Sequence, residues 1–265
     1  MLDHRSRSSL HSAWGKGFER YSNWLLSEST DGHTNVLLES PTYIETSNQV
    51  TDAIVLCGDK AVFIECKTAM MRSETKYGGQ ATRLAAEIYK KFVESNERPQ
   101  GVKQLALAIS TVFNKDTPRP VKGLNVGAIR KVYPLILTKD SIGGSIGLSK
   151  YLRKFFKPEI RANLLSVQVM PLFCLSIDHF EELAEVLEKN SLSDLLYGWW
   201  HNDRTLGSNF PLASGTGTRT QSRRLPEALM GAMDGLFDET LKYFPDFDPT
   251  EWARVKEGNN TTPES

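Results

Sequence analysis

The chain has 265 residues, of which 40% are hydrophobic and 24% charged, and its 32 basic and 32 acidic side chains cancel at neutral pH. This size and composition are typical of a globular protein with one large domain, or one domain with appendages. Zero net charge excludes binding to nucleic acid through bulk basicity, so any surface for DNA or RNA has to be local.

Cysteine usage indicates a reducing compartment. Cys57, Cys66 and Cys174 have no metal-type spacing and lie in apolar runs, where cysteine behaves as a small hydrophobic residue. No segment has the apolar length needed to cross a bilayer, and the first residues have no apolar run of signal-peptide type. We therefore expect a cytoplasmic protein.

Hydrophobic periodicity predicts alternating helices and strands along the chain. A helical stripe over 14–26 follows a polar lead at 1–13, and an extended segment at 35–46 precedes a hairpin at 50–67. The elements expected after the hairpin are helices at 80–94 and 102–113, a strand at 132–140, a basic helix at 149–161, a strand at 166–178 and a helix at 179–189.

This order predicts an α/β fold, in which helices pack on a sheet. We expect a flexible lead at 1–13 and one domain over 14–200. The stretch 201–224 is rich in Gly, Ser, Thr and Arg without any period, which indicates a loop or linker. A C-terminal helix and tail are predicted at 225–265, with the helix over 226–243.

The hairpin carries charged groups at the ends of its apolar strands. Gly58-Asp59 suits a two-residue type II′ turn, and counting outward from it brings Asp52 opposite Glu65. Lys67 shares a face with Glu65, because strand side chains alternate. Two opposed carboxylates are destabilising unless a positive group lies between them, and Mg²⁺ prefers oxygen ligands. The pattern predicts metal-assisted phosphodiester hydrolysis, with Lys67 orienting water or stabilising phosphate charge.

The same residues resemble a known family. Asp52, a spacer and then Glu65-Cys66-Lys67 at the end of an apolar strand are similar to the motif of the PD-(D/E)XK nuclease superfamily, also called restriction-endonuclease-like. GKGFERY at 15–21 resembles the G-x-x-F-E helix of many members, and GVKQL at 101–105 resembles a helix segment of members related to phage-defence nucleases. The resemblance covers about 14–180, and Thr51 stands where the family name has proline.

The resemblance implies a restriction-endonuclease-like fold with a mixed central sheet flanked by helices and, here, a C-terminal helical extension. It implies that Asp52 and Glu65 bind Mg²⁺, for which Mn²⁺ substitutes, that the Cys66 backbone carbonyl is a third ligand and that Glu19 is an auxiliary one. Lys67 would be the catalytic lysine.

The implied activity is that of a Mg²⁺-dependent deoxyribonuclease, expected to be an endonuclease of restriction or phage defence. The alternative is a catalytically silent, nuclease-like subunit that binds nucleic acid or assembles a complex. Because the chain is neutral overall, we expect a partner subunit or a homo-oligomer to supply further DNA contacts.

Residues outside the motif are more ambiguous. Of two glutamines on following helices, Gln104 is favoured over Gln80 for a place at the site. A basic helical face could bind phosphates or simply be solvated. Its members are Lys150, Arg153, Lys154, Lys157 and Arg161.

Two further features lie toward the C-terminal side of the chain. The loop arginines Arg219, Arg223 and Arg224 could clamp DNA only if they lie near the site, and His201 is predicted to anchor a helix end in the core. The histidines have no zinc-ligand spacing, and no P-loop or dinucleotide motif is present.

Overall fold

The computed structural model describes residues 4–30, 35–68, 71–140, 146–160, 164–165, 167–187 and 190–206. One compact unit extends from Trp14 to Thr220, and Met1–Ala13 belongs to a second unit with Gln221–Ser265. The predicted C-terminal helix and the three loop arginines lie outside the described residues.

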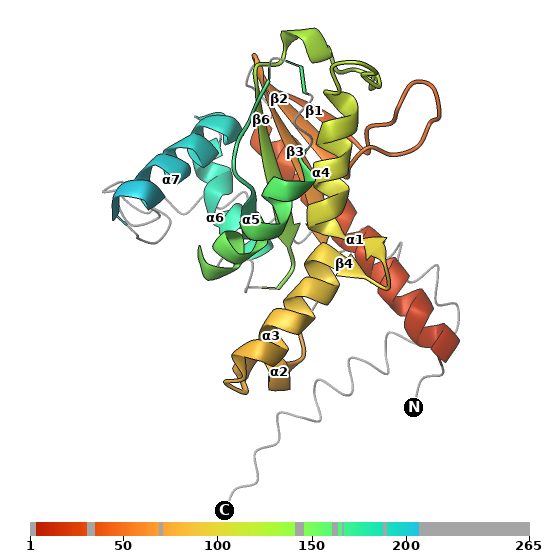
Figure 1. Ribbon diagram of the computed structural model, residues 1–265, viewed down its shortest axis with the longest axis vertical. Coiled ribbons are helices and arrows are strands. Elements are labelled where there is room, and N and C mark those ends of the chain that lie inside the picture. Colours follow the sequence, from red (N-terminus) through yellow and green to blue (C-terminus); the bar gives the residue numbers. More distant parts are fainter. Residues whose placement is uncertain are drawn as a thin grey trace, which may run out of the picture. The chain divides into compact units, whose positions relative to one another are not determined.

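A mixed sheet forms the centre of the larger unit (Figure 1). Strands β1 (Asn35–Glu39), β2 (Ala53–Cys57) and β3 (Lys60–Lys67) pair antiparallel in that order. β3 then pairs in parallel with β6 (Lys131–Thr138), whose other edge pairs in parallel with β7 (Gln168–Val169) and β8 (Phe173–Ser176). The predicted α/β class is confirmed, with a mixed central sheet flanked by helices.

The β2–β3 hairpin has the register expected from the sequence. Cys57 pairs with Lys60 and Leu56 with Ala61 across the Gly58-Asp59 turn. Gly58 has φ of 64°, the left-handed value that the first central position of a type II′ turn requires and that glycine adopts without strain. This register brings Asp52 and Glu65 to the same level of the sheet.

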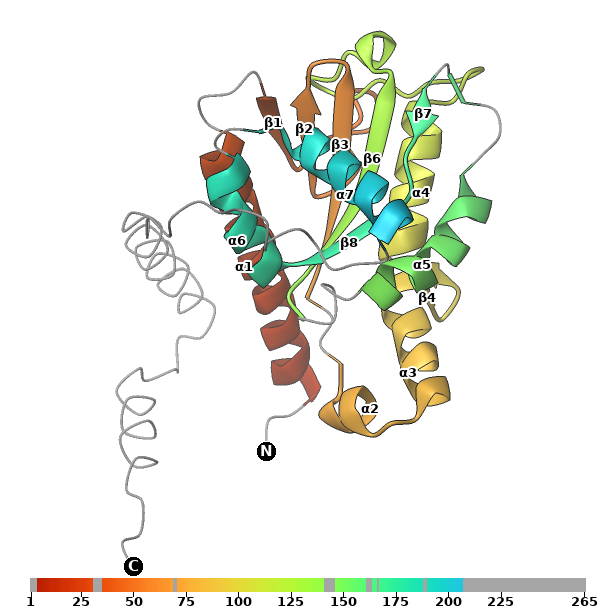
Figure 2. The ribbon, with the colours of Figure 1, turned by 90° about the vertical axis from the view of Figure 1, so that its left-hand side faces the viewer.

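Helices cover both faces of the sheet. In Figure 1, α4 (Gly101–Val112) lies on one side of the strands, and α6 (Ile177–Leu187) and α7 (Leu192–Leu206) lie on the other. α4 contacts β3, β6 and α5 (Ile146–Glu159), and Figure 2 shows α7 crossing in front of the strands.

The central strands β3 and β6 are apolar on both faces because helices bury both. Phe63, Ile64, Leu135 and Ile136 are fully buried. Burial of side chains of this size stabilises the fold by about 1.5–3 kcal/mol each, so the strand ends that carry the charged groups are held on a rigid frame.

Short elements connect β3 to α4. They are α2 (Ser73–Tyr77), α3 (Ala81–Ile88), a π-helical turn (Tyr89–Val93), and the small hairpin of β4 (Glu94–Ser95) and β5 (Arg98–Pro99). A 3₁₀ turn, Val126–Ala128, precedes β6. None of the helices in the described ranges is both long and apolar enough to cross a bilayer.

Three sequence expectations about boundaries were wrong. α1 spans His4–Thr30, so 4–13 is helical rather than a flexible lead, since no proline or glycine interrupts this polar stretch. α7 continues to Leu206, so 201–206 is helix rather than loop, and this segment contains neither proline nor glycine. The strand predicted at 166–178 is split into β7 and β8 by a segment with Pro171, which has no N–H for a sheet ladder.

Candidate active site

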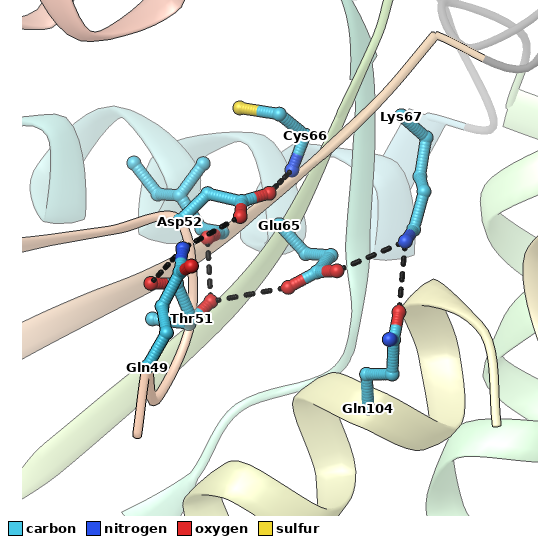
Figure 3. Close-up of polar contacts among 8 residues, drawn as sticks. Gln49, Thr51, Asp52, Glu65, Cys66, Lys67 and Gln104 are labelled. Atoms are coloured by element: carbon cyan, nitrogen blue, oxygen red, sulfur yellow. Dashed lines mark hydrogen bonds and ion pairs between the residues drawn. The ribbon is translucent and has the colours of Figure 1, made fainter. Parts of the chain in front are cut away.

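Asp52 lies where the regular β2–β3 ladder ends. Beyond the last pair, Ala53 with Ile64, the Asp52 amide donates to the Ile64 carbonyl oxygen at 3.1 Å. The Asp52 carboxylate then accepts the Cys66 amide, with Oδ2 2.6 Å from that nitrogen (Figure 3). The side chain thus replaces the missing strand partner of Cys66, which fixes the carboxylate at the end of the hairpin.

The Cys66 carbonyl faces the same edge as this carboxylate. Within an extended strand the N–H and C=O of one residue point to the same side, and the Cys66 N–H points to Asp52. The Cys66 thiol is shielded, and burial together with the nearby Asp52 charge raises its pKa well above the usual value. The backbone of Cys66, rather than its sulfur, is therefore the group with the right chemistry for a hard cation.

Glu65 is a buried acid between two polar partners. Only 7% of the residue is exposed, and its Oε1 lies 3.0 Å from Lys67 Nζ. Thr51 Oγ1 lies 3.4 Å from Oε2 and donates more closely, at 2.6 Å, to the Ile64 carbonyl. Burial raises the pKa of Glu65 to about 7, the Asp52 charge adds to the rise, and Lys67 opposes it.

Lys67 is oriented by α4. Its Nζ donates to Gln104 Oε1 at 2.8 Å, and its aliphatic stem passes the first residue of α4, Gly101. A Cβ at Gly101 would lie 3.0 Å from Lys67 Cε. Gln104 is thus at the site, as favoured from the sequence, whereas Gln80 is exposed just before α3.

Two residues that sequence reasoning missed support the acidic pair. Gln49 Nε2 donates to Asp52 Oδ1 at 3.0 Å and to the Thr51 carbonyl oxygen at 3.1 Å, and Thr51 approaches Glu65 as described above. Both lie within three residues of Asp52 in the chain, so proximity in sequence was the available signal. Burial also raises the pKa of Asp52, while the hydrogen bond from Cys66 and the Lys67 charge oppose the rise.

Glu19 lies near the acidic pair without joining it. Its Oε1 accepts the Ser40 hydroxyl at 3.3 Å, and its pKa is raised by burial and by the Asp52 charge. Among the described residues, no group of three or more His, Cys, Asp or Glu side chains could hold a metal ion. Glu19 is therefore not placed as a ligand alongside Asp52 and Glu65, and its auxiliary role stays a prediction.

An open hollow of about 700 Å³ lies over the two carboxylates. Asp52, Glu65 and Gln104 line one part of it, and Leu107 and Thr111 continue the wall along α4. Polar residues from the segments before β2 and after α4 line the remainder: Asn48, Gln49, Asn114, Thr117 and Arg119. The hollow gives a substrate access to the acids.

The basic helix predicted to bind phosphates is α5. Its Arg153 has a structural role, because Nε donates to the Leu172 carbonyl oxygen at 2.8 Å and the guanidinium lies 4.8 Å from the centroid of the Trp200 ring. Lys150, Lys154 and Lys157 are exposed, whereas Arg161 is outside the described residues. The described lining of the hollow includes no residue of α5. The structure therefore does not bring the basic side chains of this helix together with the acids.

The prediction that His201 anchors a helix end in the core was wrong. His201 is exposed and stacks on Tyr197, with ring centroids 6.0 Å apart. Trp199 is the buried anchor of α7, and its ring packs on Phe173 with centroids 5.5 Å apart.

Comparison with known proteins adds little to this geometry. No family model and no curated protein matches the chain. Among solved structures, the chain is similar to the small subunit of the heterodimeric restriction endonuclease R.BspD6I, at 13% identity over 82% of this chain and 88% of that chain, with a TM-score of 0.33. A TM-score this low does not establish a shared function.

The raised pKa of Glu65 predicts a pH-dependent stability. Between pH 4.5 and about 7 the folded protein keeps a proton that the unfolded chain has released, so the metal-free protein should lose stability as the pH rises through this window. Glu65→Gln removes the titration, and in EDTA it should be more stable than wild type at pH 8, by roughly 3 kcal/mol. The gap should shrink at pH 5.5.

Urea unfolding of both proteins at the two pH values measures this effect. Glu74→Gln, at an exposed position in α2, is the matched control and should change stability little at either pH. An equal difference between Glu65→Gln and wild type at pH 5.5 and pH 8 would contradict the assignment.

The close approach of Gly101 to the Lys67 side chain allows a test of the position of Lys67. In Gly101→Ala the added methyl would press on Lys67 Cε and displace the ammonium from Glu65 and Gln104. Cleavage should fall by roughly tenfold, as expected for a small misplacement of a catalytic group. Stability should hold or rise, because alanine favours a helix more than glycine does.

Cleavage rates and thermal unfolding of Gly101→Ala, measured together, check this. Gly17→Ala on α1 is the matched control, since nothing lies within 4 Å of a Cβ built there. Wild-type cleavage by Gly101→Ala would show that Lys67 does not depend on this contact.

Proposed function

We propose that this chain is a metal-dependent nuclease of the PD-(D/E)XK type that hydrolyses phosphodiester bonds of DNA. The observation that carries the proposal is the convergence of Asp52, the buried Glu65 and Lys67 at the end of the β2–β3 hairpin, below an open hollow. A surface hairpin with solvated charged ends would show neither the burial of Glu65 nor the second contact of Lys67 with α4.

The donor set fits a hard divalent cation. The Asp52 and Glu65 carboxylates and the Cys66 carbonyl would hold it, since Mg²⁺ prefers oxygen ligands and keeps several waters of its own. A buried carboxylate with a pKa near 7 beside a second carboxylate also gains stability from a cation. When bound, the ion would polarise the scissile phosphate and lower the pKa of a coordinated water.

The remaining contacts hold the reacting groups in place. Lys67 presents an ammonium next to the acids, where it can stabilise negative charge that develops on a phosphate oxygen. Gln104 orients that ammonium, and Thr51 contacts Glu65 from the opposite side. Because Lys67 lies on β3 and Gln104 on α4, the site needs little rearrangement before reaction.

The biological setting follows from the resemblance and from the charge. We assign the nuclease to restriction or phage defence in the cytoplasm and expect endonuclease action. A neutral chain neutralises few phosphates by itself, so a partner subunit or a second copy of the chain would supply further DNA contacts.

Cleavage of supercoiled plasmid, linear duplex and single-stranded DNA tests the proposal, with Mg²⁺ or Mn²⁺ and with EDTA. Metal-dependent cutting of at least one form is expected, and conversion of plasmid to linear product would establish endonuclease action. Mn²⁺ binding without cutting of any form would favour a nuclease that requires its partner. Neither binding nor cutting would favour the silent subunit.

A further inference from the structure

The hollow over the acids extends well beyond them. Its outer part is lined by Tyr43 and Asn48 from the segment before β2, and by Asn114, Thr117 and Arg119 from the segment after α4. Arg119 is the one basic residue among the described residues that line the hollow, whose only acids are Asp52 and Glu65. Gln104, which contacts Lys67, and Thr111, whose carbonyl accepts the Arg119 amide, are separated by about two turns of α4. The acids and the guanidinium therefore line different parts of the hollow.

Two contacts hold Arg119 in this outer part of the hollow. Its guanidinium carbon lies 5.7 Å from the centroid of the Tyr43 ring, and its backbone amide donates to the Thr111 carbonyl oxygen at 3.2 Å. The residue is exposed, and no ion pair joins it to a carboxylate within the described ranges. A guanidinium stacked on an aromatic ring is oriented but keeps its N–H donors for a ligand.

The Tyr43 platform is itself fixed by backbone pairing. Tyr43 bridges Val121, and the Ile44 amide donates to the Pro120 carbonyl oxygen at 3.0 Å, so the two segments that carry the ring and the guanidinium are joined. Burial raises the pKa of Tyr43, and the nearby Thr111 side chain on α4 opposes this rise. Arg119 therefore has a defined place relative to the acids, unlike a basic residue on a free loop.

We propose that Arg119, oriented by Tyr43, binds a phosphate that neighbours the scissile one on the same DNA strand. The proposal rests on the proposed nuclease function and names the group that holds the substrate over the acids. A guanidinium matches phosphate oxygens with paired N–H donors, whereas acids alone would repel the strand. Arg119 is then a binding residue, and its loss should weaken substrate binding more than the chemical step.

Fluorescence anisotropy of a labelled DNA oligonucleotide in EDTA tests this without cleavage, at several KCl concentrations. Arg119→Ala should raise Kd by roughly tenfold, and the slope of log K against log salt should become shallower by about 0.7–0.9, the contribution of one phosphate contact. Arg119→Lys should retain the salt slope because it retains the charge. Arg83→Ala, at an exposed position in α3, is the matched control and should leave both quantities unchanged.

Kinetics separate this role from a structural one. With metal present, Arg119→Ala should raise KM while kcat changes little, and its thermal unfolding should match that of wild type. Unchanged Kd and salt slope in Arg119→Ala would overturn the role of Arg119 while the nuclease assignment stands. If the wild-type protein binds no DNA, this inference fails. If it also cuts no DNA and binds no Mn²⁺, the proposed function fails with it.

Discussion

Replacing Glu65 with glutamine should abolish metal-dependent cleavage, with a loss of roughly three orders of magnitude or more. Glutamine has the same shape but no charge, so it cannot balance a divalent cation next to Asp52. The 3.0 Å contact with Lys67 and the 3.4 Å contact with Thr51 can both persist with an amide, so the fold should survive. Loss of activity then reports the lost charge rather than unfolding.

Plasmid cleavage by Glu65→Gln, wild type and the control Glu74→Gln checks this expectation in Mg²⁺ and in Mn²⁺. The control should cut like wild type, because Glu74 is exposed on α2. Cleavage by Glu65→Gln within tenfold of wild type would remove Glu65 from the reaction.

Replacing Lys67 with methionine should reduce cleavage by roughly 10²–10⁴-fold while the cation site remains. Methionine keeps an unbranched stem that can pack against Gly101, so the variant removes the ammonium with little change of packing. Because the Lys67 charge lowers the pKa of Glu65, its removal should raise that pKa further. Metal binding should therefore be compared at pH 8.5, which lies above the pKa of about 7 of Glu65 in wild type.

Single-turnover cleavage and Mn²⁺ titration of Lys67→Met separate these two effects. The matched control is Lys90→Met, at an exposed position of the π-helical turn. Near-normal cleavage by Lys67→Met would exclude the ammonium from the chemical step. Loss of Mn²⁺ binding at pH 8.5 would instead give Lys67 a role in building the cation site.

The core of the site could be predicted because it is local. A Gly-Asp turn between two apolar runs determines the register of the hairpin, and the register determines which charged residues meet. Asp52, Glu65 and Lys67 therefore followed from counting along two strands. The place of Gln104 required that the second helix predicted after the hairpin pack on β3.

The outer half of the hollow could not be predicted, because it depends on segments far apart in the chain. Tyr43 and Arg119 meet through isolated backbone pairing between two irregular segments, and neither segment has a periodic pattern. Arg153 is a further example: helical spacing assigns it to a basic face that could bind phosphates or be solvated, whereas the tertiary fold places its guanidinium over Trp200. Sequence spacing identifies a helix face and does not say what packs on it.

The claim that Asp52 and Glu65 together hold a cation can be tested by calorimetric titration with Mn²⁺ at pH 8.5. The titration compares the wild-type protein with Asp52→Asn. Wild type should bind Mn²⁺ and Asp52→Asn should not, because the side-chain amide oxygen of asparagine can still accept the hydrogen bond from the Cys66 N–H but carries no charge. Equal Mn²⁺ binding by both proteins, or none by wild type, would contradict the assignment of this hairpin as a metal-dependent active site.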